Sequence, residues 1–91
     1  MRADDVLMLE ERWKNTNKDT IVDNMEKYLI RFNPECKKYN TKIKTLMEIS
    51  GEKEQTVYAW INRSRKEVKI PFLKLCKIAS ALNIGVEDIL G

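Results

Sequence analysis

Residues 46–62, which read LMEISGEKEQTVYAWIN, contain the pattern that decides the fold. Gly51 stands where the C-terminus of a helix favours a residue with a left-handed backbone, because glycine has no Cβ atom to clash there. Apolar residues at helical spacing precede Gly51, and Val57, Trp60 and Ile61 follow it in the same way. The stretch therefore predicts two short helices joined by a tight turn, a helix-turn-helix.

Apolar residues recur at helical spacing on both sides of this stretch, and strand-like alternation is absent from the sequence. Short polar side chains predict helix starts, with the N-cap at Asp19 or Thr20 for one helix and at Asn40 or Thr41 for the next. Pro34 ends the first of these two helices, because the residue before a proline avoids the helical region. We expect an all-α domain with helices at about residues 4–14, 20–33, 41–50, 53–62, 71–82 and 86–90.

Residues 1–19 form a separate helical extension in this interpretation, and residues 20–91 form the helix-turn-helix domain. Val6, Leu9 and Trp13 make an apolar stripe along the extension. The stripe either folds back on the domain's own core, pairs with a second copy or binds a partner protein, because an amphipathic stripe alone does not choose its partner. The extension has four basic and five acidic residues, a net charge of −1, which argues against an arm wrapped around DNA.

The composition argues against a metal site, a cofactor and an enzyme. Cys36 and Cys76 lie far apart and the chain has no histidine, so it lacks four suitable zinc ligands and the commonest general base. No Gly-rich phosphate loop or nucleophile motif is present. We expect Cys76 to be buried and Cys36 to be more exposed. No apolar run approaches the roughly 18 residues that cross a bilayer, which predicts a cytoplasmic protein.

The 91 residues carry a net charge of +3, and the positive charge is concentrated after the predicted helix-turn-helix. Residues 62–69 contain Arg63, Arg65, Lys66 and Lys69 against the single acid Glu67. A basic cluster of this kind forms either a solvated loop or a contact for phosphate.

Residues 46–62 resemble the helix-turn-helix of the lambda-repressor-like family, of Cro/C1 or Xre type. The matching positions are Leu46, Met47, Gly51, Thr56, Val57, Trp60 and Asn62. Residues 69–91, KIPFLKLCKIASALNIGVEDILG, are similar to the closing pair of helices in that family. The resemblance covers residues 21–91 and implies a five-helix DNA-binding domain with an extra short N-terminal helix. Two residues depart from the family pattern, because Glu52 replaces an apolar turn residue and Lys53 replaces a Ser or Thr cap.

The resemblance implies that the second motif helix lies in the major groove with its N-terminal end toward the bases. The residues expected to read bases are Glu54, Gln55, Thr56, Tyr58 and Ala59. The residues expected to contact phosphates are Lys42, Lys44, Lys53, Asn62, Arg63, Arg65 and Lys66. A glutamine can bond adenine through two hydrogen bonds, and a glutamate can accept from the cytosine amino group.

The implied function is a sequence-specific regulator of bacterial or phage type, a repressor that binds double-stranded DNA without a cofactor. A homodimer on a pseudo-palindromic operator is expected, because one copy offers a small interface. The alternative function is a protein-interaction module such as the antitoxin of a toxin–antitoxin pair, which would bind its partner through the N-terminal helix or the basic loop.

Overall fold

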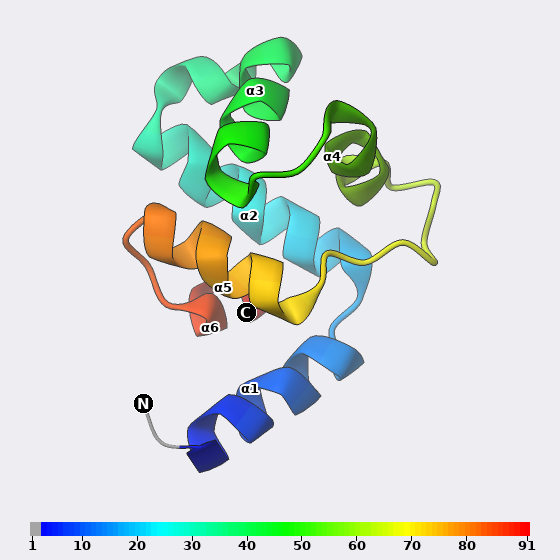
Figure 1. Cartoon of the computed structure of the whole chain (residues 1–91), viewed down its shortest axis with the longest axis vertical. Coiled ribbons are helices and arrows are strands. Elements are labelled where there is room, and N and C mark those ends of the chain that lie inside the picture. The colour runs from blue at the N-terminus through cyan, green and yellow to red at the C-terminus, as the bar shows by residue number, and fades with distance from the viewer. Residues whose placement is uncertain (1–2) are drawn as a thin grey trace.

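The computed structural model describes residues 3–91, with side chains from Asp5 onward. Over that range the chain is all-α, as expected, and the structure shows no strand there. In Figure 1, α2 crosses the middle of the molecule, with α3 and α4 on one side and α5, α6 and α1 on the other. The elements are α1 (Ala3–Asn15), α2 (Lys18–Phe32), the 3-10 helix η1 (Pro34–Lys37), α3 (Tyr39–Ser50), α4 (Glu54–Ile61), α5 (Phe72–Ala81) and α6 (Val86–Leu90).

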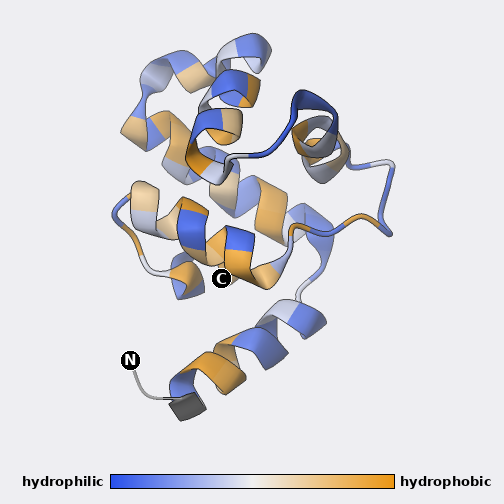
Figure 2. Ribbon diagram, viewed as in Figure 1, coloured by the Kyte–Doolittle hydropathy of each residue, from blue (hydrophilic) through white to orange (hydrophobic). Residues whose placement is uncertain are grey.

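Apolar side chains from α2 through α6 meet in one core, in which none is more than 8% exposed. Figure 2 shows apolar and polar residues side by side along the helices, the pattern of amphipathic helices. From α2, Ile21, Val22, Met25 and Leu29 are buried. Phe32 lies on the same stripe but is 56% exposed. The last turn of α2 borders an open groove there, so a position on the apolar stripe does not bury Phe32.

The start of α2 differs from the sequence prediction. Asn17 is the N-cap, and its side-chain oxygen accepts a hydrogen bond of 2.8 Å from the Thr20 backbone N–H. The predicted cap at Asp19 or Thr20 is therefore wrong. All three residues have a side chain that can cap a helix, so residue type alone did not choose among them.

The link between α2 and α3 is more ordered than predicted. Asn33 accepts from the Glu35 backbone N–H at 3.1 Å and opens η1. α3 then begins at Tyr39, with Lys38 as an N-cap that makes no side-chain hydrogen bond. The predicted cap at Asn40 or Thr41 is wrong, because the chain already turns into a helix directly after η1.

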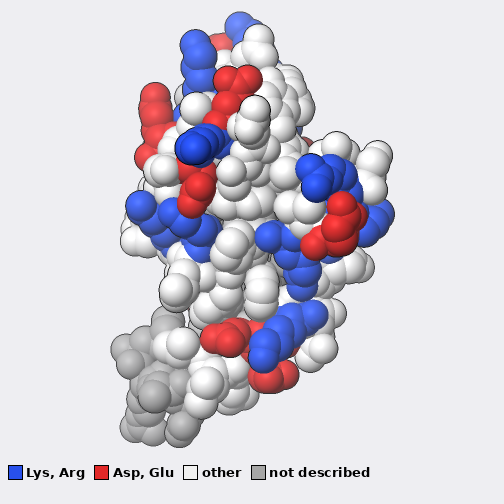
Figure 3. Space-filling model, turned by 45° about the vertical axis from the view of Figure 1, so that its right-hand side comes forward, with Lys and Arg blue, Asp and Glu red and all other residues white. Residues whose placement is uncertain are grey.

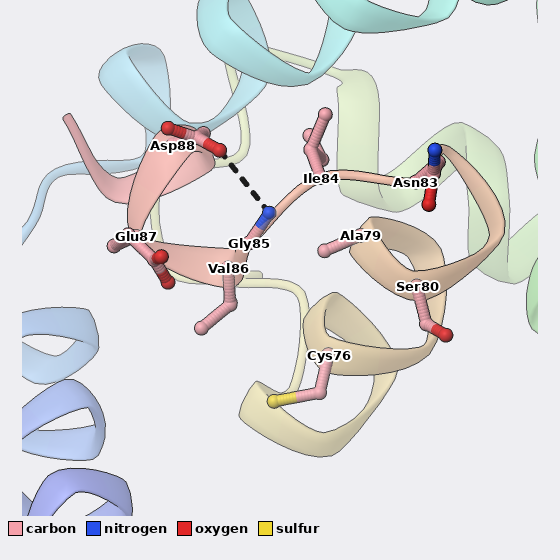
Figure 4. A pocket seen from close by; sticks show the side chains of 9 residues that line it. All are labelled: Cys76, Ala79, Ser80, Asn83, Ile84, Gly85, Val86, Glu87 and Asp88. Carbon is pink, nitrogen blue, oxygen red and sulfur yellow. Dashed lines mark hydrogen bonds between the residues drawn. The ribbon is translucent and has the colours of Figure 1, made fainter. Parts of the chain in front are cut away.

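The other helix ends follow the sequence closely. Gly51 has φ of 73°, the left-handed conformation predicted for it, and its N–H donates to Met47 at 2.8 Å. Pro71 stands at the N-cap of α5. At the start of α6, the Asp88 carboxylate accepts from the Gly85 N–H at 3.1 Å, as Figure 4 shows.

The two cysteines are placed opposite to the expectation. Cys36 is a completely buried residue of η1, and its thiol donates to the Thr45 hydroxyl at 3.5 Å. Cys76 is partly exposed and lines a pocket of about 620 Å³ between α5 and α6 (Figure 4). The expectation is wrong because residues 34–37 form η1, which the sequence pattern did not show and which turns the Cys36 side chain into the core. Burial still raises the pKa of the Cys76 thiol.

The stripe on α1 folds back on the chain's own core. Val6, Leu9 and Trp13 are partly buried against it. The Trp13 indole donates a hydrogen bond of 2.8 Å to the Ile70 carbonyl. The Lys69 ammonium lies 4.9 Å from the centroid of the Trp13 ring and donates to the Trp13 carbonyl at 2.6 Å. Three contacts therefore hold α1 in place: the Trp13–Ile70 hydrogen bond, the cation–π contact of Lys69 with Trp13, and the hydrogen bond from Lys69 to the carbonyl end of the helix.

The opposite side of α1 remains uncovered. Leu7 and Met8 are 63% and 67% exposed. At its C-terminal end, Arg12 donates to the Gly91 carbonyl at 2.7 Å. The extension thus contacts its own domain through one face, and a second face is open to solvent.

Trp60 tests the arrangement of the core. The side chain is 3% exposed, so Trp60→Ala leaves a large cavity and should lower the free energy of unfolding by about 3–5 kcal/mol. Chemical denaturation measures this loss. Phe32→Ala is the matched control, because it also removes an aromatic ring but from an exposed position. Equal denaturation midpoints for the two variants would contradict the inward position of Trp60.

Candidate nucleic-acid interface

The turn between α3 and α4 is fixed by side-chain hydrogen bonds. The Ser50 hydroxyl donates to the Leu46 carbonyl at 2.6 Å and accepts from the Glu52 N–H at 3.2 Å. Lys74 of α5 donates to the Ser50 carbonyl at 2.9 Å and lies 2.9 Å from the Glu52 carboxylate. The unusual acid in the turn therefore has a cationic partner. These contacts attach the turn to α5 and set the direction in which α4 leaves it.

α4 has one buried and one exposed side. Val57, Trp60 and Ile61 are 0%, 3% and 7% exposed, which confirms the predicted inward face. Of the residues predicted to read bases, Glu54 and Gln55 are exposed. The remaining three are half-buried: Thr56, Tyr58 and Ala59. The first turn of α4 thus presents polar side chains, and Lys53 before it makes no side-chain cap that would cover the helix start.

Lys18 holds the other end of α4. Its side chain is buried, and the ammonium donates to the Ala59 carbonyl at 2.7 Å and to the Arg65 carbonyl at 2.8 Å. The Ala59 carbonyl is one of the last four of the helix, which have no partner within it. Burial lowers the pKa of Lys18, while the nearby Glu67 acts in the opposite direction. Sequence reasoning missed Lys18, because the predicted helix began with a cap at Asp19 or Thr20 and so left Lys18 outside it.

An aromatic pair lies where α3 and α4 meet. The ring centroids of Tyr39 and Tyr58 are 5.5 Å apart. Tyr39 is 51% exposed, and partial burial together with the nearby Tyr58 raises the pKa of its hydroxyl. Sequence reasoning did not select Tyr39, although its place in the first turn of α3 puts it beside the expected reading helix.

The residues predicted to contact phosphates fall into two groups. Lys44 and Lys53 are exposed and form no ion pair within residues 5–91. Asn62 accepts from the Ser64 N–H at 3.0 Å and shapes the loop after α4. Arg65 lies 3.4 Å from Glu67 in a pair that is open to solvent on both sides.

The second group is paired with acids of α2. Its members are Lys42, Arg63 and Lys66, whose partners are Asp19, Asp23 and Glu26. The Lys42 side chain is only 12% exposed. On the face in Figure 3, basic and acidic side chains lie beside one another in several places. Sequence reasoning missed these acids, although their spacing of four and three residues already placed them on one face of α2.

In the part of the chain that the structure describes, no group of three or more His, Cys, Asp or Glu side chains is arranged to hold a metal ion. No helix within residues 3–91 has the length and apolar character needed to cross a bilayer.

Comparison with models of known protein families gives one match. Residues 33–91 match the model of the Cro/C1-type HTH DNA-binding domain. The matched region begins at the end of α2 and includes α3, the turn, α4, α5 and α6. A search of curated proteins and a search of solved structures each found no match to the chain.

Lys18 allows a test of what holds α4. Lys18→Met removes the donor from two carbonyls and should lower the free energy of unfolding by about 1–3 kcal/mol. Lys18→Arg keeps the positive charge and the hydrogen-bond donors, so it should lower the free energy of unfolding by less than Lys18→Met. Lys27→Met, on the exposed side of the same helix, is the control for loss of a lysine. Urea denaturation measures all three, and equal midpoints for Lys18→Met and Lys27→Met would show that the two hydrogen bonds contribute nothing.

Proposed function

The chain belongs to the Cro/C1-type helix-turn-helix DNA-binding family, and from this premise we propose that it is a sequence-specific repressor which reads double-stranded DNA with α4. DNA binding and transcription regulation are properties of the family, which is one of binding domains rather than enzymes. The sequence specificity, the repressing effect and the residues responsible are the proposal.

The exposed first turn of α4 carries this proposal. In helix-turn-helix domains the N-terminal residues of the second helix contact base edges in the major groove. Here Glu54 and Gln55 are the exposed side chains at that end. The Gln55 amide has a donor and an acceptor and therefore suits adenine, whereas the Glu54 carboxylate accepts from cytosine. The turn and the buried opposite face are also needed, because they hold the helix in the orientation in which these side chains can reach base edges.

The half-buried residues of α4 support close approach to the groove. Ala59 has a small side chain that admits a thymine methyl group, and Thr56 can bond a base edge or a phosphate. The Tyr58 ring is supported by Tyr39, so the hydroxyl can bond a phosphate with little loss of rotamer freedom. The contacts with DNA phosphates are then made by Lys44, Lys53, Asn62 and Arg65. The cations paired with α2 can add to them once those ion pairs open.

Gln55→Ala tests base reading. It should cost about 1–3 kcal/mol on the preferred site, because a bidentate base contact is lost. Binding to a scrambled duplex should stay nearly unchanged, because an uncharged side chain releases no counterions. The preferred site comes from selection out of a random DNA library, and titration of both duplexes gives the comparison. Equal weakening on the two duplexes would rule out Gln55 as a reader.

Lys53→Ala tests contact with the DNA backbone and is the counterpart of Gln55→Ala. It should weaken both duplexes to a similar extent, and it should make the slope of log K against log salt shallower by about 0.9. The measurement is a titration at several salt concentrations. An unchanged slope would place Lys53 away from phosphate.

A homodimer on a pseudo-palindromic operator is part of the proposal, because one domain offers a small interface. The core-facing stripe of α1 is already used within the chain, so a dimer seam on α1 must use its exposed face. Leu7→Lys combined with Met8→Lys should then yield a folded monomer. Sedimentation measures the assembly, and Leu73→Lys is the control, because Leu73 is a 78% exposed residue on α5. A monomer produced by Leu73→Lys alone would move the seam to α5.

A further inference from the structure

Three carboxylates form a row along one face of α2. Asp19, Asp23 and Glu26 are separated by four and three residues, which places them on successive turns of the same side of the helix. We call them the acidic row. It lies outside residues 33–91, so the match to the DNA-binding family says nothing about it.

Three cations from the helix-turn-helix and the loop after it bind this row, and we call Lys42, Arg63 and Lys66 the paired cations. Arg63 lies 2.6 Å from Asp23, 3.6 Å from Glu26 and 3.9 Å from Asp19. Lys66 lies 2.6 Å from Asp19. Lys42 lies 3.3 Å from Glu26. The charges balance, three negative against three positive.

Arg63 is the centre of the network, because its guanidinium reaches all three carboxylates. The guanidinium fork binds carboxylate and phosphate with the same geometry. A carboxylate that occupies the fork therefore excludes a phosphate from it. The Arg63 and Asp23 side chains are 41% and 64% exposed, so the pair lies at the surface, where DNA can compete for it.

We propose that the acidic row is an internal competitor of the DNA backbone, which holds the paired cations away from phosphate and so weakens DNA binding. This inference rests on the proposed function. Nonspecific affinity comes almost entirely from phosphate neutralisation. A cation that already has a carboxylate partner gains little from a phosphate until that pair opens. The row thus lowers the affinity for DNA although the loop is strongly basic.

Asp23→Asn is the first variant of the test, because its carboxylate is exposed and makes the shortest contact to Arg63. Opening one surface ion pair corresponds to a gain of about 1.5- to 5-fold in affinity. The full chain should therefore bind a scrambled duplex more tightly by this factor, and the salt slope should become steeper by up to about 0.9. Glu87→Gln is the control. It removes the same charge from α6, where no described cation is paired with it.

Arg63→Ala distinguishes competition from simple loss of negative charge. Its affinity and salt slope in the wild-type background serve as the reference for the double variant. In the Asp23→Asn background it should abolish the gain. A gain that survives Arg63→Ala, or an equal gain from Glu87→Gln, would overturn the proposal in favour of a long-range charge effect.

Two other outcomes also overturn it. If Asp23→Asn weakens binding while circular dichroism shows the same melting, the ion pairs serve to position the loop. If the wild type binds DNA but Asp23→Asn changes neither affinity nor slope, the competition is absent and the proposed function stands. A wild type that binds no duplex at any salt concentration would remove the proposed function and this inference together.

Discussion

An eight-residue helix is not stable by itself in water, and α4 has that length. Its position therefore depends on burial of its inner face, where Val57 and Trp60 enter the core. The two ends need separate support, since the terminal amides and carbonyls have no partners within so short a helix. Lys74 fixes the turn before α4 and Lys18 fixes the carbonyls at its end. If this docking fails, no surface of fixed shape remains to meet DNA.

Two sets of basic residues in this chain serve different purposes. Lys18, Lys69 and Lys74 donate to backbone carbonyls of distant segments and hold helices together. The paired cations bind carboxylates instead. A count of basic residues therefore overstates the positive charge that DNA encounters, because many of these groups already have partners inside the molecule. The +3 net charge is compatible with a weak as well as a strong attraction to the backbone.

The sequence was sufficient for the fold and for the orientation of α4, because both follow from local pattern. Helical periodicity predicted the helices, and Gly51 predicted the turn. The inward position of Trp60 followed from the same spacing, whereas the outward position of Gln55 was implied by the family resemblance. Lys18 and the acidic row were not predictable in the same way. The contact between Asp19 and Lys66 joins residues 47 positions apart in the sequence, and a local sequence pattern gives no information on contacts at that separation.

The errors at helix starts and at the cysteines have a different cause. Asn17, Asp19 and Thr20 all have side chains that can serve as an N-cap, so residue type alone did not identify Asn17. Cys36 was predicted to be exposed because it lies in a polar segment. η1 turns that segment over the core and buries the one side chain that is apolar enough to enter. In both cases residue type alone did not determine the position that the structure shows.

The two kinds of cation contact also respond differently to DNA and to salt. A carbonyl bound by Lys18 is part of the backbone, so its bond can be lost only if α4 or the loop moves. A carboxylate bound by Arg63 is a surface side chain, and a phosphate can replace it while the fold stays the same. Salt screens exposed pairs far more than buried hydrogen bonds. The proposed competition would therefore act through α2 without moving α4, the helix that we propose reads the bases.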